Sequence, residues 1–480
     1  MPVEAWRRHR LDGFLGTVTP AIALRLAKAV ETDRLLGGAL PHDEIMGALR
    51  PRLRDAQNRL SRVASPRRLV CAAFEDVLFD GVRRRKQRGR IARSSIAPVW
   101  SWLEATLPKD VLELLDVIRD KLLTSGAEFA DTEVAAFQRA AAAALLKEIP
   151  TGEPADPRIA GGAKLLGGID IATDAYDMAR MLEIGTDLLR LQREFPKPMH
   201  TLSESDISLT RAVWENVVAE HPDSASYVVF LMLGRLEKPW EIMRLAGALS
   251  RKTDDIVVSR TDAGFVGDLL LSDLEDCVAI LRPMRADAVE PLTVQLQVET
   301  FAHLSTGIVR EIGIKRDGLW GKRLMAARGA ISDEMERLLG RARKDIIATL
   351  PMVRKGGFGL RATGRAPDFT RRVDPAKAAR AIELASIIAG VRPHAMAGAF
   401  AGMLAEIEEP VTEHLRHFTT EMIEQIQGIA AEQRPQVELH VSHAVDLTRL
   451  LLGAEEGDLI RRRAAAATAA ADEESATLVA

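Results

Sequence analysis

The sequence predicts an all-α protein, built as a multi-part helical bundle or irregular helical array with little or no β-structure. Ala, Leu and Arg are abundant among the 480 residues, whereas aromatic residues make up only 4%. The abundant residues lose little conformational freedom in a helix, while the aromatic and β-branched residues that favour strands are comparatively sparse. Apolar residues also recur at steps of three and four between Pro and Gly breaks, as amphipathic helices require.

Helix starts and stops are clear near the N-terminus. Thr19 and Pro20 form an N-cap and first-turn pair, and the helical spacing that follows stops at Gly37. Further along, Ser95 is expected to cap a helix that ends near Pro108.

The chain length predicts about three domains at ~150 residues each. Stretches rich in Pro and Gly at residues 149–170 and 351–374 mark the expected breaks. The predicted parts are a basic helical domain at residues 1–150, a central helical domain at 151–350, a C-terminal helical domain at 351–463 opened by a Gly/Arg-rich loop, and a disordered Ala-rich and acidic tail at 464–480.

The most regular pattern in the chain lies in the C-terminal domain. It steps by three and four without exception, as a seam between helices requires, and consists of Leu404, Ile407, Val411, Leu415, Phe418, Met422, Ile426 and Ile429. The seam faces either another helix of this chain or a second copy. Pro410 either begins a new helix or lies within this one.

The cysteines and the hydropathy indicate the compartment. Cys71 and Cys277 lie far apart in apolar helical surroundings, so we expect buried thiols in a reducing cytosol. No stretch of 18 apolar residues and no continuous signal-peptide core is present. We therefore expect a cytoplasmic protein without transmembrane insertion.

Seven cations stand within residues 83–93, with no acid among them. They are Arg83, Arg84, Arg85, Lys86, Arg88, Arg90 and Arg93. This basic run lies in residues 1–100, which carry a formal charge of +10, whereas the remaining residues carry −13. Guanidinium groups suit phosphate oxygens, so the run predicts an anion-binding segment. The equal alternative is that it pairs with the chain's own acidic parts.

A second cationic segment follows residue 351. Arg354, Lys355, Arg361 and Arg365 stand among glycines there and are further candidates for anion binding. The Lys precedes the glycines and no strand is predicted before them, so the segment does not have the order of a nucleotide P-loop. A connection between domains is the favoured interpretation.

Metal and catalytic sites have weaker support. Glu413, His417 and Glu421 recur every four residues and form one ridge of a helix, a weak metal candidate because a single ridge cannot complete a site. His440 and His443, three residues apart, likewise lie on one helix ridge and cannot complete a metal site by themselves. The sequence shows no nucleophile elbow, zinc-binding cysteine set or dinucleotide fingerprint. We therefore predict no metal, no cofactor and no catalytic residue.

The leading hypothesis is a helical interaction or scaffold protein whose cationic N-terminal region binds an anionic partner. Protein partners or self-association through helical seams, and nucleic acid or an anionic surface through the basic run, are the expected interactions. The alternatives are an enzyme acting on a phosphorylated or anionic substrate, and a peripheral membrane protein.

Overall fold

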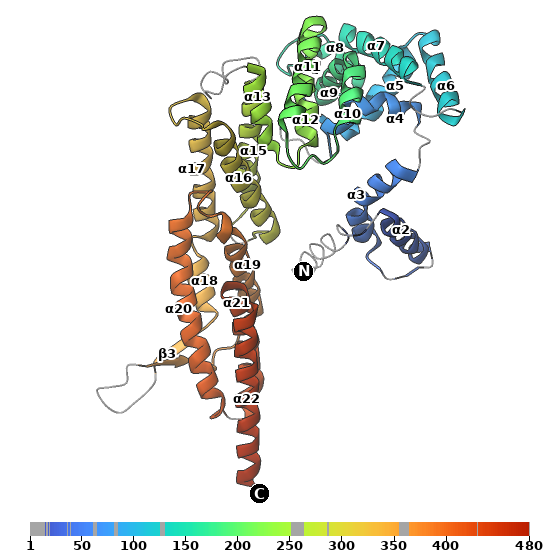
Figure 1. Cartoon of the computed structure of the whole chain (residues 1–480). Coiled ribbons are helices and arrows are strands. Elements are labelled where there is room, and N and C mark those ends of the chain that lie inside the picture. The colour runs from blue at the N-terminus through green and yellow to red at the C-terminus, as the bar shows by residue number, and fades with distance from the viewer. Residues whose placement is uncertain are drawn as a thin grey trace. The chain divides into compact units, whose positions relative to one another are not determined.

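The computed structural model divides into two compact units, Met1–Leu249 and Ser250–Ala480, each built mainly of helices (Figure 1). It describes residues 15, 18, 20–35, 37–38, 40–60, 65–80, 85–124, 130–250, 264–285, 288–354, 364–429 and 431–479. The predicted all-α class is confirmed. Among the described residues, the named strands form two short two-stranded sheets.

The described part of the first unit consists of helices and a pair of two-residue strands. Its elements are α2 (Pro20–Leu35), α3 (His42–Leu60), α4 (Pro66–Cys71), η1 (Ala72–Val77), β1 (Leu78–Phe79), β2 (Ile91–Ala92), η2 (Arg93–Ser95), α5 (Ile96–Thr106), α6 (Lys109–Thr124), α7 (Asp131–Glu148), α8 (Ile159–Leu166), α9 (Ile169–Glu183), α10 (Gly185–Glu194), α11 (Glu204–Glu220), η4 (Pro222–Ser224), α12 (Ser226–Arg235), η5 (Pro239–Glu241) and α13 (Ile242–Ser250). Strands β1 and β2 pair in parallel.

Helix α9 lies at the centre of the packing in this unit. It packs against α7, α8 and β2, and most of its side chains from Ala172 to Leu182 are buried. Two of the buried side chains, Asp174 and Asp177, are carboxylates. Such groups need partners, because a carboxylate buried without them is costly.

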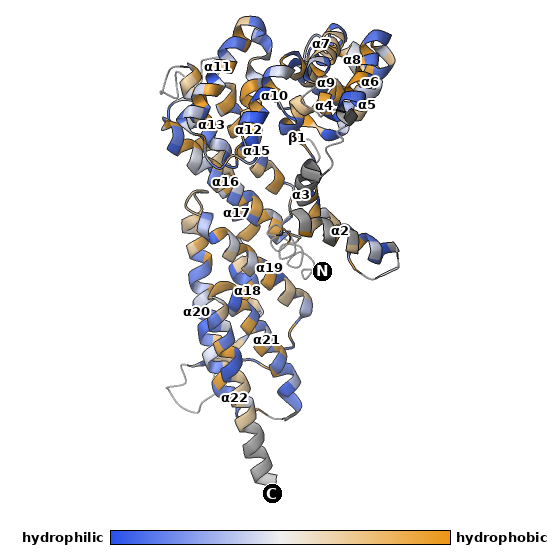
Figure 2. Ribbon diagram, turned by 45° about the vertical axis from the view of Figure 1, so that its right-hand side comes forward, coloured by the Kyte–Doolittle hydropathy of each residue, from blue (hydrophilic) through white to orange (hydrophobic). Residues whose placement is uncertain are grey.

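The second unit has longer helices and one β-hairpin. Its elements are α15 (Phe265–Leu281), α16 (Pro291–Ile312), α17 (Leu319–Leu339), α18 (Ala342–Ala348), β3 (Met352–Arg354), β4 (Arg365–Pro367), α19 (Pro375–Val391), η6 (Arg392–His394), α20 (Ala401–Ile426), η7 (Ala431–Gln433), α21 (Arg434–Leu451) and α22 (Ala454–Val479). Apolar and polar residues alternate along these helices (Figure 2), as expected where one face packs and the other meets water.

The predicted seam is the buried face of α20. From Leu404 to Ile426 each of its members is buried, while Ile429 lies beyond the helix end. The face packs against α18, α21 and α22, so the seam is satisfied within the chain. Pro410 lies inside α20, which continues through it.

The C-terminal tail differs from the expectation of disorder. Residues 464–479 continue α22, and Ala464 and Ala467 are buried. Ala has the highest helix propensity of all residues, and its small side chain lets α22 approach α21 closely. The expected domain boundary near residue 150 lies inside the first unit, where α7 and α9 pack on each other across it.

Both cysteines are buried, and burial raises the pKa of each thiol to about 12. Ser95 does not cap α5 with its side chain. Among the described residues, no helix combines the length and the apolar character that crossing a bilayer requires.

Truncation of a side chain in the seam is expected to cause a large loss of stability. Leu415→Ala removes a fully buried side chain from α20 and is expected to lower the free energy of unfolding by ~2–5 kcal/mol. Leu296→Ala on α16, where the side chain is 57% exposed, is the matched control, expected to change it by less than ~0.5 kcal/mol. Denaturant unfolding of the full chain measures both. Equal effects of the two substitutions would show that α20 does not pack as described.

Candidate functional site

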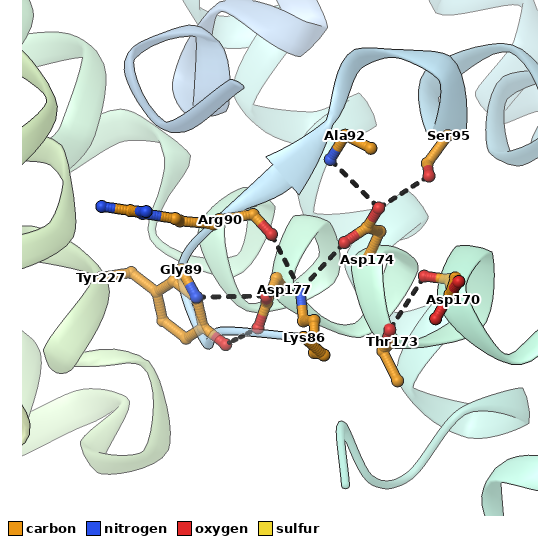
Figure 3. A network of polar contacts seen from close by, with 10 residues as sticks. All are labelled: Lys86, Gly89, Arg90, Ala92, Ser95, Asp170, Thr173, Asp174, Asp177 and Tyr227. Atoms are coloured by element: carbon orange, nitrogen blue, oxygen red, sulfur yellow. Dashed lines mark hydrogen bonds and ion pairs between the residues drawn. The ribbon is translucent and has the colours of Figure 1, made fainter. Parts of the chain in front are cut away.

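The described part of the basic run lies against α9, with Lys86 between two aspartates (Figure 3). Lys86 Nζ donates to Asp174 Oδ1 at 2.9 Å and to Asp177 Oδ2. Its third proton goes to the carbonyl oxygen of Arg90 at 3.0 Å. The Lys86 side chain is 8% exposed and the aspartate side chains are 2% exposed or less. An ammonium with all three protons bound is thus enclosed by the chain's own acids.

The same two carboxylates bind the residues that follow Lys86. Asp174 Oδ2 accepts from the backbone N–H of Ala92 at 3.1 Å and from the Ser95 hydroxyl at 2.7 Å. Asp177 Oδ2 accepts from the N–H of Gly89 at 3.1 Å. Because one ammonium faces two carboxylates, these donors stabilise the excess negative charge. They also fix residues 86–95 on α9.

Tyr227 of α12 completes the network. Its hydroxyl donates to Asp177 Oδ1 at 2.6 Å. Burial, with the nearby Asp177 charge as the next cause, raises the pKa of Tyr227 well above its usual value, so the phenol keeps the proton it donates.

Gly89 is required at the turn of this loop. Its φ is +75°, and a Cβ at this position would lie 2.2 Å from the Phe230 ring. Only glycine adopts such a conformation freely, and the crowding excludes a side chain independently of φ. The close approach brings the N–H of Gly89 to Asp177.

The arginines of the run meet different surroundings. The Arg88 guanidinium lies 5.3 Å from the centre of the Tyr227 ring and donates to the carbonyl of Asp223 at 3.0 Å. Arg93 pairs with Asp80 and Glu75. The Arg90 side chain points away from the aspartates (Figure 3). Arg85 is exposed.

The remaining two cations of the run, Arg83 and Arg84, lie outside the described residues. Lys86 and Arg93 contact acids of the same chain, as the alternative interpretation of the run predicts.

The second cationic segment forms a hairpin in the second unit. Strands β3 and β4 are antiparallel, and Arg354 lies directly opposite Arg365. Both residues are exposed. Side chains at opposite positions of an antiparallel pair share one face of the sheet, and like charges there repel. Lys355 and Arg361 lie outside the described residues.

The three metal candidates lie on α20. Glu413 and His417 are exposed on α20 and Glu421 is half-buried. Among the described residues, no group of three or more His, Cys, Asp or Glu side chains is placed to hold a metal ion. His440 and His443 bind other partners, described below.

A cavity of about 600 Å³ lies between α21 and α22. Its walls combine Val437, Val441 and Val445 with charged residues that include Arg449 and Arg461. Both of these arginines are paired with Asp458. Among the described residues, no cation predicted to bind an anion lines this cavity.

Among the described residues, the all-α fold holds a cationic loop in which Lys86 and Arg93 are paired with carboxylates, and an exposed pair of arginines at opposite positions of β3 and β4. Comparisons with protein-family models, with curated proteins and with solved structures found no match. The assignment of function therefore depends on the geometry.

Sequence reasoning missed the two aspartates that hold Lys86. A signal was present, because Asp174 is in helical register with Met178 and Met181 on the buried face of α9. An acid on an apolar helix face predicts a buried partner. The identity of that partner, 88 residues earlier, is not contained in the pattern.

We expect Lys86→Met to destabilise the first unit by ~3–5 kcal/mol, because two buried carboxylates lose their cation. The control is Lys109→Met on α6, where the lysine side chain is 92% exposed and the unfolding midpoint is expected to stay unchanged. Denaturant unfolding followed by tryptophan fluorescence measures both. A wild-type midpoint for Lys86→Met would contradict the network.

Gly89→Ala and Gly167→Ala separate crowding from backbone strain. Both glycines have positive φ, +75° and +89°, but at Gly167 no atom lies within 4 Å of an added Cβ. Gly89→Ala is expected to cost at least ~1 kcal/mol more than Gly167→Ala, because the Phe230 ring must move. Thermal unfolding of the two variants tests this difference, and an equal loss would remove the packing argument.

Proposed function

We propose that the chain is a helical interaction protein that binds a phosphate-bearing partner through exposed arginines. The observation that carries the proposal is the pair Arg354 and Arg365, two exposed residues at directly opposite positions of β3 and β4. Holding two guanidinium groups at opposite positions costs free energy that a bound anion would offset. Guanidinium forks match phosphate oxygens in geometry as well as in charge.

The basic run supports the same proposal, but with fewer of its cations than the sequence suggests. Lys86 is bound by carboxylates and anchors the loop. The further candidates for the partner are the arginines near Lys86 in the sequence, Arg83, Arg84, Arg85 and Arg90.

The proposal is tested with the full chain and two probes, a duplex DNA oligonucleotide and phosphatidylserine vesicles. Fluorescence anisotropy and vesicle co-sedimentation at several salt concentrations measure binding and separate nucleic acid from membrane as the source of phosphate. Arg354→Ser with Arg365→Ser is expected to weaken binding and to reduce the slope of log affinity against log salt by about 2 on DNA.

The matched control replaces two exposed arginines that already have carboxylate partners, Arg119 and Arg310, with serine. It changes the net charge by the same amount and is expected to bind as the wild type does. A second variant replaces Arg83, Arg84, Arg85 and Arg90 with serine and keeps Lys86, so that the anchor remains. Absence of salt-sensitive binding by the wild type to both probes would overturn the proposal, as would equal binding by all variants.

A further inference from the structure

Two histidines of α21 bind opposite ends of the segment that contains the β3–β4 hairpin. His440 Nε2 lies 2.9 Å from the carbonyl oxygen of Arg371, which follows β4. His443 Nε2 lies 2.8 Å from Thr349 Oγ1, which precedes β3. A third imidazole, that of His414 on α20, binds the carbonyl of Leu350 at 2.9 Å. Both sides of the hairpin base are therefore attached to the helices through imidazole rings.

The partners fix which nitrogen carries the proton. Arg371 offers a carbonyl, so His440 Nε2 must donate. The Thr349 hydroxyl donates to the carbonyl of Ile346 at 2.7 Å, so its oxygen accepts from His443 Nε2. In neutral rings with the proton on Nε2, Nδ1 is an acceptor.

The surroundings of His440 do not accommodate a second proton. The residue is 1% exposed, and its Nδ1 is buried without a hydrogen-bond partner among the described residues. Phe369 packs edge-on against the ring at 5.6 Å between centroids, and Phe418 of α20 lies at 6.3 Å. A proton on Nδ1 would place a charged donor in this apolar space with no acceptor.

Burial is the largest influence on the pKa of both rings. Burial is the largest cause that lowers the pKa of His440, and the Arg371 carbonyl and Asp368 act in the opposite direction with smaller effect. For His443, burial and then the neighbouring His440 lower the pKa to about 4. From α20, the ring of Phe418 lies against His440.

We propose that His440 and His443 form an acid-sensitive clamp, which docks the ends of the β3–β4 segment on α21 while both rings are neutral and releases them when the rings take up protons. The clamp goes beyond anion binding and does not depend on it, since it concerns only the docking of this segment.

The direction of the pH effect follows from the lowered pKa values. Protonation is easier in the released state, so docking is fully stable above the ordinary histidine pKa of 6.5 and weakens as the pH falls from there towards about 4. For His443 alone, the shift makes release on the order of 30-fold more favourable at about pH 5 than at about pH 7.5.

Amide hydrogen exchange of the full chain, read by mass spectrometry and corrected for the intrinsic pH dependence, tests the clamp. We expect exchange in residues 349–354 and 365–371 to rise at least tenfold relative to α9 between about pH 7.5 and pH 5. Unchanged protection of these residues across that range would overturn the proposal. Simultaneous loss of protection throughout residues 265–451 would also overturn it, because that result means unfolding of the unit.

The double variant H440Q/H443Q adds a control that does not titrate. Each glutamine amide can donate as Nε2 does and stays neutral at both pH values. The variant keeps His414 on Leu350 and is expected to show a clearly smaller change in relative exchange between the two pH values than the wild type. A pH response equal to that of the wild type would refute the role of these rings. Should the variant fail to fold, the pH series of the wild type decides alone.

Discussion

The first unit depends on burying one ammonium group between two carboxylates. A buried Lys86 is tolerated only when each of its protons has an acceptor, and Asp174, Asp177 and the Arg90 carbonyl supply these. This requirement fixes the loop relative to α9, which in turn brings the N–H groups of Gly89 and Ala92 to the same carboxylates. The path of the loop and the contact of α12 through Tyr227 thus meet at the same two carboxylates.

The proposed function depends on a difference between the two cationic segments in what their cations contact. A run of like charges is costly when it is solvated alone, yet in the first unit Lys86 and Arg93 contact acids, and Arg88 lies over an aromatic ring. The number of cations in the run therefore includes two, Lys86 and Arg93, that already contact carboxylates of the chain. In the hairpin, two arginines face each other at the surface. The proposed binding of an anion therefore depends on this pair rather than on the number of cations in the sequence.

Prediction from sequence succeeded where the determining contacts are local. The helical class and the buried face of α20 follow from periodicity, because steps of three and four place side chains on one stripe whatever the partner. The Lys86 network was not predictable, since its partners lie 88 and 91 residues away and are ordinary acids of an otherwise apolar helix. The composition of the tail predicts disorder, whereas in the structure its residues continue α22, as the high helix propensity of alanine favours. Binding of His440 and His443 to the hairpin base equally required the fold, because their i,i+3 spacing is the same in a metal site, a solvated face and a buried clamp.

The buried polar side chains of the two units are stabilised in different ways. In the first, opposite charges neutralise each other, so the anchor is strong only if every donor and acceptor remains in place. In the second, imidazole supplies a neutral donor and also an aromatic surface, as the contacts of His440 with Phe369 and Phe418 show. Lysine or arginine at residue 440 would bring a permanent charge into that space, and asparagine would leave the ring volume empty. Histidine meets both requirements only in its neutral form, so a structural role at this position carries a dependence on pH with it.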